Sequence, residues 1–253
     1  MKTNTKSKVL DKCAPVLLVI GILLVWQLLC TALNVSEHLL PKPTAIFAAL
    51  GENFTKSILP DALSSLQTML IGYLIAIPLG FVIAAIASQF KFVVRMLLPV
   101  LILLMVTPMA TLVPEFKLFL GVSPSLKVLI VTLQCAPVIA VNSMTGFTHV
   151  PKNKLDVAKG LGCGRWETFF RLVVPNAMPQ IFTGLKLGCI LCTIASMSAD
   201  LSVGQGGLGY RISISASLSA TDTAFAAILV AAVLGVLFYT AVSLIEKRAV
   251  TWK

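Results

Sequence analysis

Two segments of this sequence have the spacing of known chemical motifs. Cys189 and Cys192 have Cys-x-x-Cys spacing, which in a thioredoxin-like setting would support thiol–disulfide exchange. Residues 204–209, Gly-Gln-Gly-Gly-Leu-Gly, match the Gly-x-Gly-x-x-Gly pattern of dinucleotide-binding loops. However, the cysteines lie within a long apolar stretch, and no strand precedes the glycines as a nucleotide fold requires. We therefore interpret the cysteines as small apolar residues of a buried helix and the glycines as a tight turn.

Catalytic and metal-binding constellations are missing from the sequence. His38 and His149 are its only histidines, and we predict them on opposite faces of a membrane, which removes most metal-hydrolase and histidine-based schemes. No segment matches the Gly-x4-Gly-Lys-Ser/Thr loop that binds ATP. We expect no catalytic residue, no metal site and no cofactor in this chain, and therefore not an enzyme.

The composition identifies the class of protein. The chain has 253 residues, of which 57% are hydrophobic and 12% charged, and its mean hydropathy is +0.95. The charged fraction is about half of the roughly 25% typical of soluble domains. Disordered chains are polar and charge-rich, and six cysteines in this length do not make a small disulfide scaffold. The sequence therefore predicts an all-α, polytopic membrane protein.

Six apolar stretches approach the roughly 20 residues that a membrane-crossing helix needs. They are residues 14–33, 66–88, 96–113, 124–148, 181–200 and 224–245. We expect them to form one transmembrane domain over residues 1–253. Between the first two, residues 43–54 have helical apolar spacing after two prolines, which predicts either an amphipathic helix on the outer surface or a re-entrant helix.

Basic residues indicate the orientation of these spans. The formal net charge is +10, and cytoplasmic loops collect Lys and Arg. With the N-terminus inside, the inner segments hold Lys2, Lys6, Lys8, Lys12, Lys91, Arg95, Lys152, Lys154, Lys159, Arg165, Arg171, Lys247, Arg248 and Lys253. The outer segments hold Lys42, Lys56, Lys117, Lys127 and Arg211. This bias predicts that both termini are cytoplasmic, and it explains the positive charge without nucleic acid.

The longest inner loop, residues 149–180, is the most polar part of the second half of the chain. Its pattern predicts a first helix, a glycine turn at 160–164, and a second helix that carries Trp166 and Phe169. Pro175 and Pro179 are expected to break the chain before the fifth span. Composition leaves two alternatives open: a helix pair that lies on the lipid surface, or a docking element for a soluble partner.

The spacing in this loop resembles the cytoplasmic signature of ABC importer permeases, which is Glu-Ala-Ala, three residues, Gly, nine residues and Ile-x-Leu-Pro. Residues 156–158, Asp-Val-Ala, occupy the triplet, Gly162 follows at the right distance, and 172–175, Leu-Val-Val-Pro, close the pattern. Val157 in place of the first alanine is the largest departure. The resemblance implies that the loop couples to an ATPase through Asp156, Val157, Ala158, Gly162, Cys163, Gly164 and Pro175.

Three further stretches are similar to the nitrate/sulfonate/taurine branch of that family. They are residues 40–44, 107–114 and 207–210, the last being Gly-Leu-Gly-Tyr. The resemblance covers about residues 14–248, whereas Glu115 and Lys117 depart from it. A phosphonate or amino-acid branch is the alternative. A secondary transporter fits less well because a partner-docking loop is present, and a membrane enzyme would need polar catalytic groups clustered at one depth.

The resemblance implies a type I importer fold in the bacterial cytoplasmic membrane. Two such permeases, expected to be identical, would form a pore above two ABC ATPases that bind ATP and magnesium. An extracytoplasmic solute-binding protein would deliver the substrate. Nitrate, sulfonates, taurine and small vitamin precursors are the substrates that this branch suggests.

Polar residues within the apolar stretches are candidates for the substrate pathway. Such residues are costly in a membrane and tend to face a pore or another helix. The candidates are Gln134, Asn142, Ser143, Ser196, Ser198 and Asp200. Hydrogen bonds between helices are the alternative for each. Asp200 is the strongest candidate, although it is near the outer end, where water would solvate it.

Overall fold

A computed structural model describes residues 5–251, together with the side chains in this range except those of 5–13, 15 and 16. The basic side chains of Lys2, Lys6, Lys8, Lys12 and Lys253 therefore lie outside the described residues. The described chain is helical throughout, as predicted. Its elements are α1 Thr5–Ala32, α2 Pro43–Asn53, the π-helical turn η1 Phe54–Ile58, α3 Leu59–Ser88, α4 Lys91–Val106, α5 Met109–Leu120, α6 Pro124–Thr148, α7 Lys152–Gly160, α8 Arg165–Thr168, the π-helical turn η2 Phe169–Val173, α9 Val174–Val203, α10 Leu208–Ser217 and α11 Thr221–Ala249.

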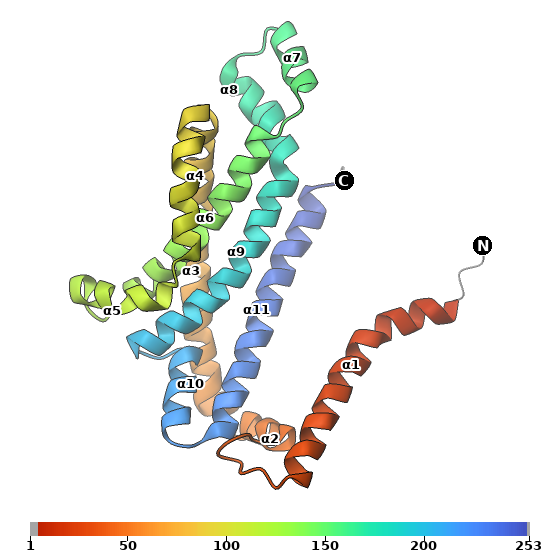
Figure 1. The fold of residues 1–253 in the computed structure, drawn as a ribbon, viewed down its shortest axis with the longest axis vertical. Helices are drawn as coiled ribbons and strands as arrows, with labels where there is room; N and C mark the ends of the chain where they lie inside the picture. Colours follow the sequence, from red (N-terminus) through yellow and green to blue (C-terminus); the bar gives the residue numbers. More distant parts are fainter. Residues whose placement is uncertain (1–4, 252–253) are drawn as a thin grey trace.

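Helices α3, α6 and α9 form the centre of the molecule, with α4 and α11 beside them (Figure 1). Small residues bring the backbones close, as is common between helices in membranes. A Cβ on Gly72 would lie 2.6 Å from Cγ1 of Val131, and one on Gly80 would lie 2.8 Å from the carbonyl oxygen of Ala136. Helix α6 is consequently the most buried element, packed between α3 and α9.

Four helical segments of the described chain are long and apolar enough to cross a membrane: 43–88, 124–148, 165–203 and 221–249. Helices α4 and α5 together add a fifth, although they are bent by 92°. The apolar part of α1 is shorter, Leu17–Ala32. The helical class is thus confirmed, while the count of six spans stays a prediction.

The third expected span, residues 96–113, is not one helix. Helix α4 ends at Val106, Thr107 and Pro108 are extended, and α5 leaves at 92°. A residue before proline is disfavoured in the helical region because of the clash with the proline ring. Figure 1 shows α5 projecting sideways from the bundle as a result.

The prediction that Pro175 and Pro179 break the chain is wrong. Helix continues from Arg165 to Val203. The π turn η2 shifts the hydrogen-bond register, since Val174 donates to the carbonyl of Phe169, five residues back. Pro175, which has no N–H, follows directly in the first turn of α9. The loop expected over 149–180 therefore shrinks to about 149–164, and its second half is the end of a 39-residue helix.

The segments that join the spans also differ in part from expectation. Residues 43–53 form the predicted short helix, α2, which continues through η1 into α3. The glycine-rich turn does not lead straight into the last span, because α10 intervenes between it and α11. Helices α2 and α10 lie at one end of the molecule, and α7 and α8 lie at the other (Figure 1).

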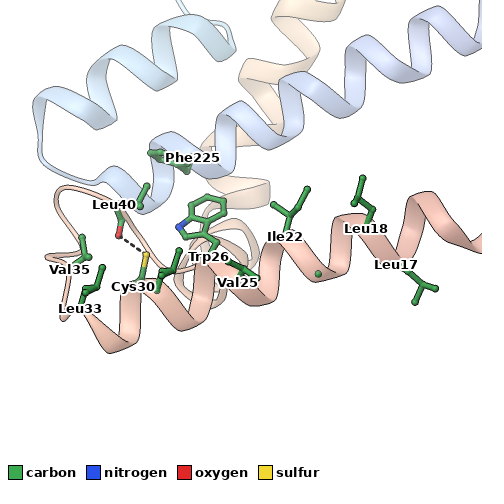
Figure 2. Close-up of a pocket in the computed structure, with 12 residues that line it drawn as sticks. Leu17, Leu18, Ile22, Val25, Trp26, Cys30, Leu33, Val35, Leu40 and Phe225 are labelled. Atoms are coloured by element: carbon green, nitrogen blue, oxygen red, sulfur yellow. Dashed lines mark hydrogen bonds between the residues drawn. The ribbon is translucent and has the colours of Figure 1, made fainter.

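Helix α1 diverges from the bundle and meets it only near its C-terminal end (Figure 1). There Trp26 packs against Phe225 of α11 with ring centroids 6.0 Å apart. Figure 2 shows the groove of about 960 Å³ that α1 leaves on this side. Apolar side chains such as Ile22 and Val25 line it, so this face suits lipid chains or another apolar helix.

Candidate functional site

A buried ion pair lies at the α10 end of the bundle. Nζ of Lys127 on α6 is 2.8 Å from Oδ1 of Asp200 on α9, and the two side chains are only 3% and 0% exposed. An unpaired charge at such a position would be expensive to bury. The pair therefore fixes the relative position of α6 and α9 at this end.

The remaining polar atoms of this pair are also satisfied. Lys127 donates to the carbonyl oxygens of Gln205 at 2.7 Å and Gly206 at 2.8 Å, so all three ammonium protons have acceptors. Ser65 on α3 donates its hydroxyl to Oδ2 of Asp200 at 2.5 Å. The same hydroxyl oxygen accepts the backbone N–H of Leu208 at 2.8 Å.

A second acidic residue holds the other side of the loop. Asp61, at the start of α3, accepts the N–H of Gly207 at 3.0 Å and Nε of Arg211 at 2.7 Å. We call the set of Asp61, Ser65, Lys127, Asp200, residues 205–208 and Arg211 the loop network. It joins α3, α6, α9 and α10 through a single short stretch of backbone.

Two of the glycines in residues 204–209, Gly207 and Gly209, are explained by close contacts of this loop. Gly207 has a φ of +97°, and a Cβ there would overlap the carboxylate of Asp200. A Cβ on Gly209 would overlap the carbonyl oxygen of Met197. The loop backbone must lie directly on the ion pair, and only glycine allows this approach. The nucleotide-like pattern therefore has a packing cause, in agreement with the interpretation as a tight turn.

Asp200 thus occupies a different environment from the one expected of a pathway residue. Its side chain has no exposed surface, so it does not contact a solute in this conformation. The sequence reasoning missed Lys127, Ser65 and Asp61 as its neighbours. The sequence contains one signal for Lys127 as the partner of Asp200. The two residues have opposite charges and lie at the same end of the fourth and fifth expected spans.

The other pathway candidates are not brought together at one point. Ser143 and Ser196 are fully buried; Ser196 donates to the carbonyl of Ser65 at 3.5 Å, as a hydrogen bond between helices. Gln134, Asn142 and Ser198 are half-buried. These three keep surface for a solute, although Nδ2 of Asn142 already donates within α6, to the carbonyl of Val138 at 2.8 Å.

The opposite end carries the exposed helix α7, none of whose residues is buried. Its C-terminus is closed by two hydrogen bonds, from Cys163 to the carbonyl of Ala158 and from Gly162 to that of Lys159. These bonds form a Schellman motif, which needs a left-handed residue. Gly162 supplies it with a φ of +77°, and no atom lies within 4 Å of a Cβ placed there.

Six of the seven predicted coupling residues lie together on this tip. Asp156 is exposed, and its carboxylate is 4.0 Å from Nζ of Lys159. Val157 is 63% exposed and Leu161, beside the predicted set, is 77% exposed. Pro175 is the exception, because it lies in α9. The tip therefore presents exposed apolar side chains and an exposed carboxylate.

Arg165, which the sequence reasoning did not select, connects the tip to the bundle. Its Nε donates to Oε1 of Gln89 and its Nη2 to the carbonyl of Gln89, both at 3.1 Å. Its guanidinium also lies over the ring of Phe90, 5.6 Å from the centroid. Phe169 packs in the core below, against Phe147. A force on α7 would thus be passed directly to the helices.

Comparison with known proteins shows the family to which this chain belongs. Residues 76–251 match the family described as binding-protein-dependent transport system inner membrane component. A putative aliphatic sulfonates transport permease protein, SsuC, of Bacillus subtilis is 27% identical over 92% of this chain and 84% of its own length. The taurine transport system permease protein TauC of Escherichia coli is 25% identical over 91% and 86%.

A solved structure has the same fold. An amino acid ABC transporter determined with histidines aligns with a TM-score of 0.64 and 14% identity. The alignment covers 78% of this chain and 95% of the other. At this identity the likeness concerns the fold alone.

The loop network yields a matched pair of substitutions. Gly204 and Gly207 both have positive φ. Gly204 is in the left-handed helical region with ψ 18°, where alanine costs roughly 1–2 kcal/mol, whereas Gly207 has ψ 163°, a region that is essentially restricted to glycine and costs at least as much. Only at Gly207 does the new Cβ meet Asp200; at Gly204 it meets nothing within 4 Å. We expect Gly207→Ala to lower the thermal midpoint of the detergent-purified protein by several degrees more than Gly204→Ala.

Limited proteolysis at residues 204–207 should rank the two variants as the thermal midpoints do, with faster cleavage in Gly207→Ala than in Gly204→Ala. Equal midpoints and cleavage rates for the two variants would contradict the packing of this loop on the ion pair.

Proposed function

This chain belongs to the family of binding-protein-dependent transport system inner membrane components and is a permease of an ABC importer, and from that premise we propose how it is coupled to its partners. The tip formed by Asp156–Ala158 and Gly162–Gly164 is the coupling element that binds an ABC ATPase. The exposed tip carries the proposal, because Val157 and Leu161 are 63% and 77% exposed among the residues that the structure describes. Large apolar side chains left on a surface at one point mark a site of interaction.

Continuity of helix supports a mechanical role for this tip. The helix from Arg165 to Val203 has 39 residues, so it extends on the order of 60 Å at 1.5 Å per residue. It begins beside the coupling element and ends beside Asp200. When ATP binding draws two ATPases together, the tip moves with them, and the long helix transmits the movement to the outer end. This is alternating access by rocking of helix bundles.

The assembly we propose contains two identical copies of this permease and two ABC ATPases, with ATP and magnesium bound by the ATPases. A solute-binding protein delivers substrate at the α2–α10 end. The half-buried side chains of Gln134, Asn142 and Ser198 on α6 and α9 then face the pathway between the copies. Polar groups in a membrane favour a water-filled path over lipid.

The transported solute we propose is a small organic sulfonate. The support is the pair of relatives named for aliphatic sulfonates and taurine, together with the Gly-Leu-Gly-Tyr sequence at 207–210. Uptake of labelled taurine by proteoliposomes that contain the permease, its ATPase and its binding protein tests this. Uptake of labelled nitrate without uptake of taurine would assign another substrate of the same branch, and uptake of an amino acid alone would move the protein to another branch.

The glycine that closes α7 provides the first test of coupling. Valine at Gly162 carries the left-handed cost of about 1–2 kcal/mol, so the Schellman turn is lost and the tip is misplaced. We expect Gly162→Val to insert normally, to co-purify little ATPase and to abolish uptake, with Asp156→Ala showing the same effect more mildly.

Gly160 offers the matched control, because it also has open space around its Cβ but ordinary helical φ. Gly160→Val should keep most ATPase binding. Wild-type binding and transport by Gly162→Val would remove the tip from its proposed role.

Stoichiometry is the second test. The permease purified alone should hydrolyse no ATP, because it has no ATP-binding loop of the Gly-x4-Gly-Lys type. Native mass spectrometry of the complex with its ATPase should give two permeases and two ATPases. A mass with one permease for two ATPases would be incompatible with the proposed pair.

Orientation is the third test, since both termini are proposed to be cytoplasmic on the charge bias. In a background without Cys13 and Cys163, a membrane-impermeant maleimide should not label Ser7→Cys or Thr251→Cys in intact cells. It should label both after permeabilisation, whereas Ser217→Cys at the opposite end should react in intact cells. Labelling of either terminus from outside would contradict the proposed topology.

A further inference from the structure

A cavity of about 500 Å³ lies between the tip of the coupling element and the end of α3. Its polar wall includes Lys159, Cys163, Arg165 and Ser88, and its apolar floor includes Phe147 and Phe169. No carboxylate lines it. Two cations and a hydroxyl above an apolar floor favour an anionic ligand with an apolar part.

The two cations differ in how firmly they are held. Arg165 is fixed by its two hydrogen bonds to Gln89 and by the ring of Phe90, which leaves its Nη1 for a ligand. Lys159 is 78% exposed, and its ion-pair partner Asp156 is 4.0 Å away and 73% exposed. Such an exposed pair contributes little, so the ammonium group is available to an anion.

A second cavity of about 270 Å³ shares Arg165 and Gln89 with the first. Ile86, Phe90 and Trp166 line it, and these side chains are 61%, 55% and 70% exposed. Ile86 and Phe90 lie where α3 ends and α4 begins, and Trp166 lies on α8 beside them. This cavity therefore offers an apolar channel directly beside the cationic one.

We propose that the two cavities bind one anionic phospholipid. The phosphate lies between Lys159 and Arg165, and an acyl chain follows Ile86, Phe90 and Trp166 outward. A free phosphate would use only the first cavity, whereas the shared wall of Arg165 and Gln89 suits a headgroup continued by a chain. Basic pockets between helices at a membrane surface bind headgroups in this way. The bound lipid ties α7 to the turn between α3 and α4.

The site can be tested on the permease alone, independently of whether the tip docks an ATPase. Cys163 lines the cationic cavity, so its reaction with maleimide reports occupancy. The other cysteines whose side chains the structure describes are buried, and Cys13→Ser removes the remaining one. In nanodiscs of phosphatidylglycerol we expect Cys163 to react at least threefold more slowly than in phosphatidylcholine, with no such protection by inorganic phosphate.

Paired variants separate this site from the general effect of a charged membrane on the thiol. Lys159→Gln should lose the protection by phosphatidylglycerol. Lys152→Gln should keep the protection, because Lys152 is an exposed residue of the same helix that does not line the cavity. The two variants change the net charge equally, so a difference between them is not an effect of total charge. Equal protection in the two variants, no difference between the lipids, or equal protection by inorganic phosphate would each overturn the proposal. Unchanged thermal midpoints would establish that both variants are folded.

Discussion

The ion pair between Lys127 and Asp200 is the constraint on which the α2–α10 end of this molecule depends. Two charges removed from solvent at 2.8 Å are stable only when their other hydrogen-bonding positions are filled. Ser65 and two loop carbonyls fill them. Those carbonyls belong to the loop whose backbone lies on the carboxylate, and this close approach explains the glycine at position 207. The hydroxyl of Ser65 and the glycine loop thus both serve to satisfy the buried charge pair, which would otherwise be costly to remove from solvent.

The same physics explains which parts could be predicted from the sequence. Apolar stretches, the helix after Pro43 and the left-handed Gly162 follow from local rules of length, proline and helix termination. The continuity through Pro175 and the partner of Asp200 do not. The π turn at Phe169–Val173 depends on a register change that no propensity encodes. The ion pair joins residues 73 positions apart; the sequence shows two opposite charges at one predicted depth, but the packing of α6 against α9 is needed to establish that they meet.

In the third expected span, proline outweighs apolar length. Residues 96–113 are apolar enough for a single span, but Pro108 lies within this stretch and Pro114 follows it. In the structure the restriction before Pro108 prevails over the hydrophobic pattern, and α5 turns by 92°. Lys117 on this turned helix then donates to the carbonyl of Ser202 at the end of α9. A basic residue that departs from the family pattern therefore has a structural contact.

The two ends of the long helix have opposite mechanical character. At Asp200 the backbone and side chains are held by buried, mutually dependent hydrogen bonds, whereas α7 contributes no buried residue and contacts the bundle through the hydrogen bond from Lys154 to Asn176 and the half-buried Leu155. Regions with few buried contacts open at low free energy. A partner that binds at α7 therefore meets a surface that moves with little resistance. Because helix is continuous from Arg165 to Val203, the movement reaches the loop network as a displacement of α9 against α3 and α6. The ion pair would resist this displacement, so the α2–α10 end rearranges as a unit.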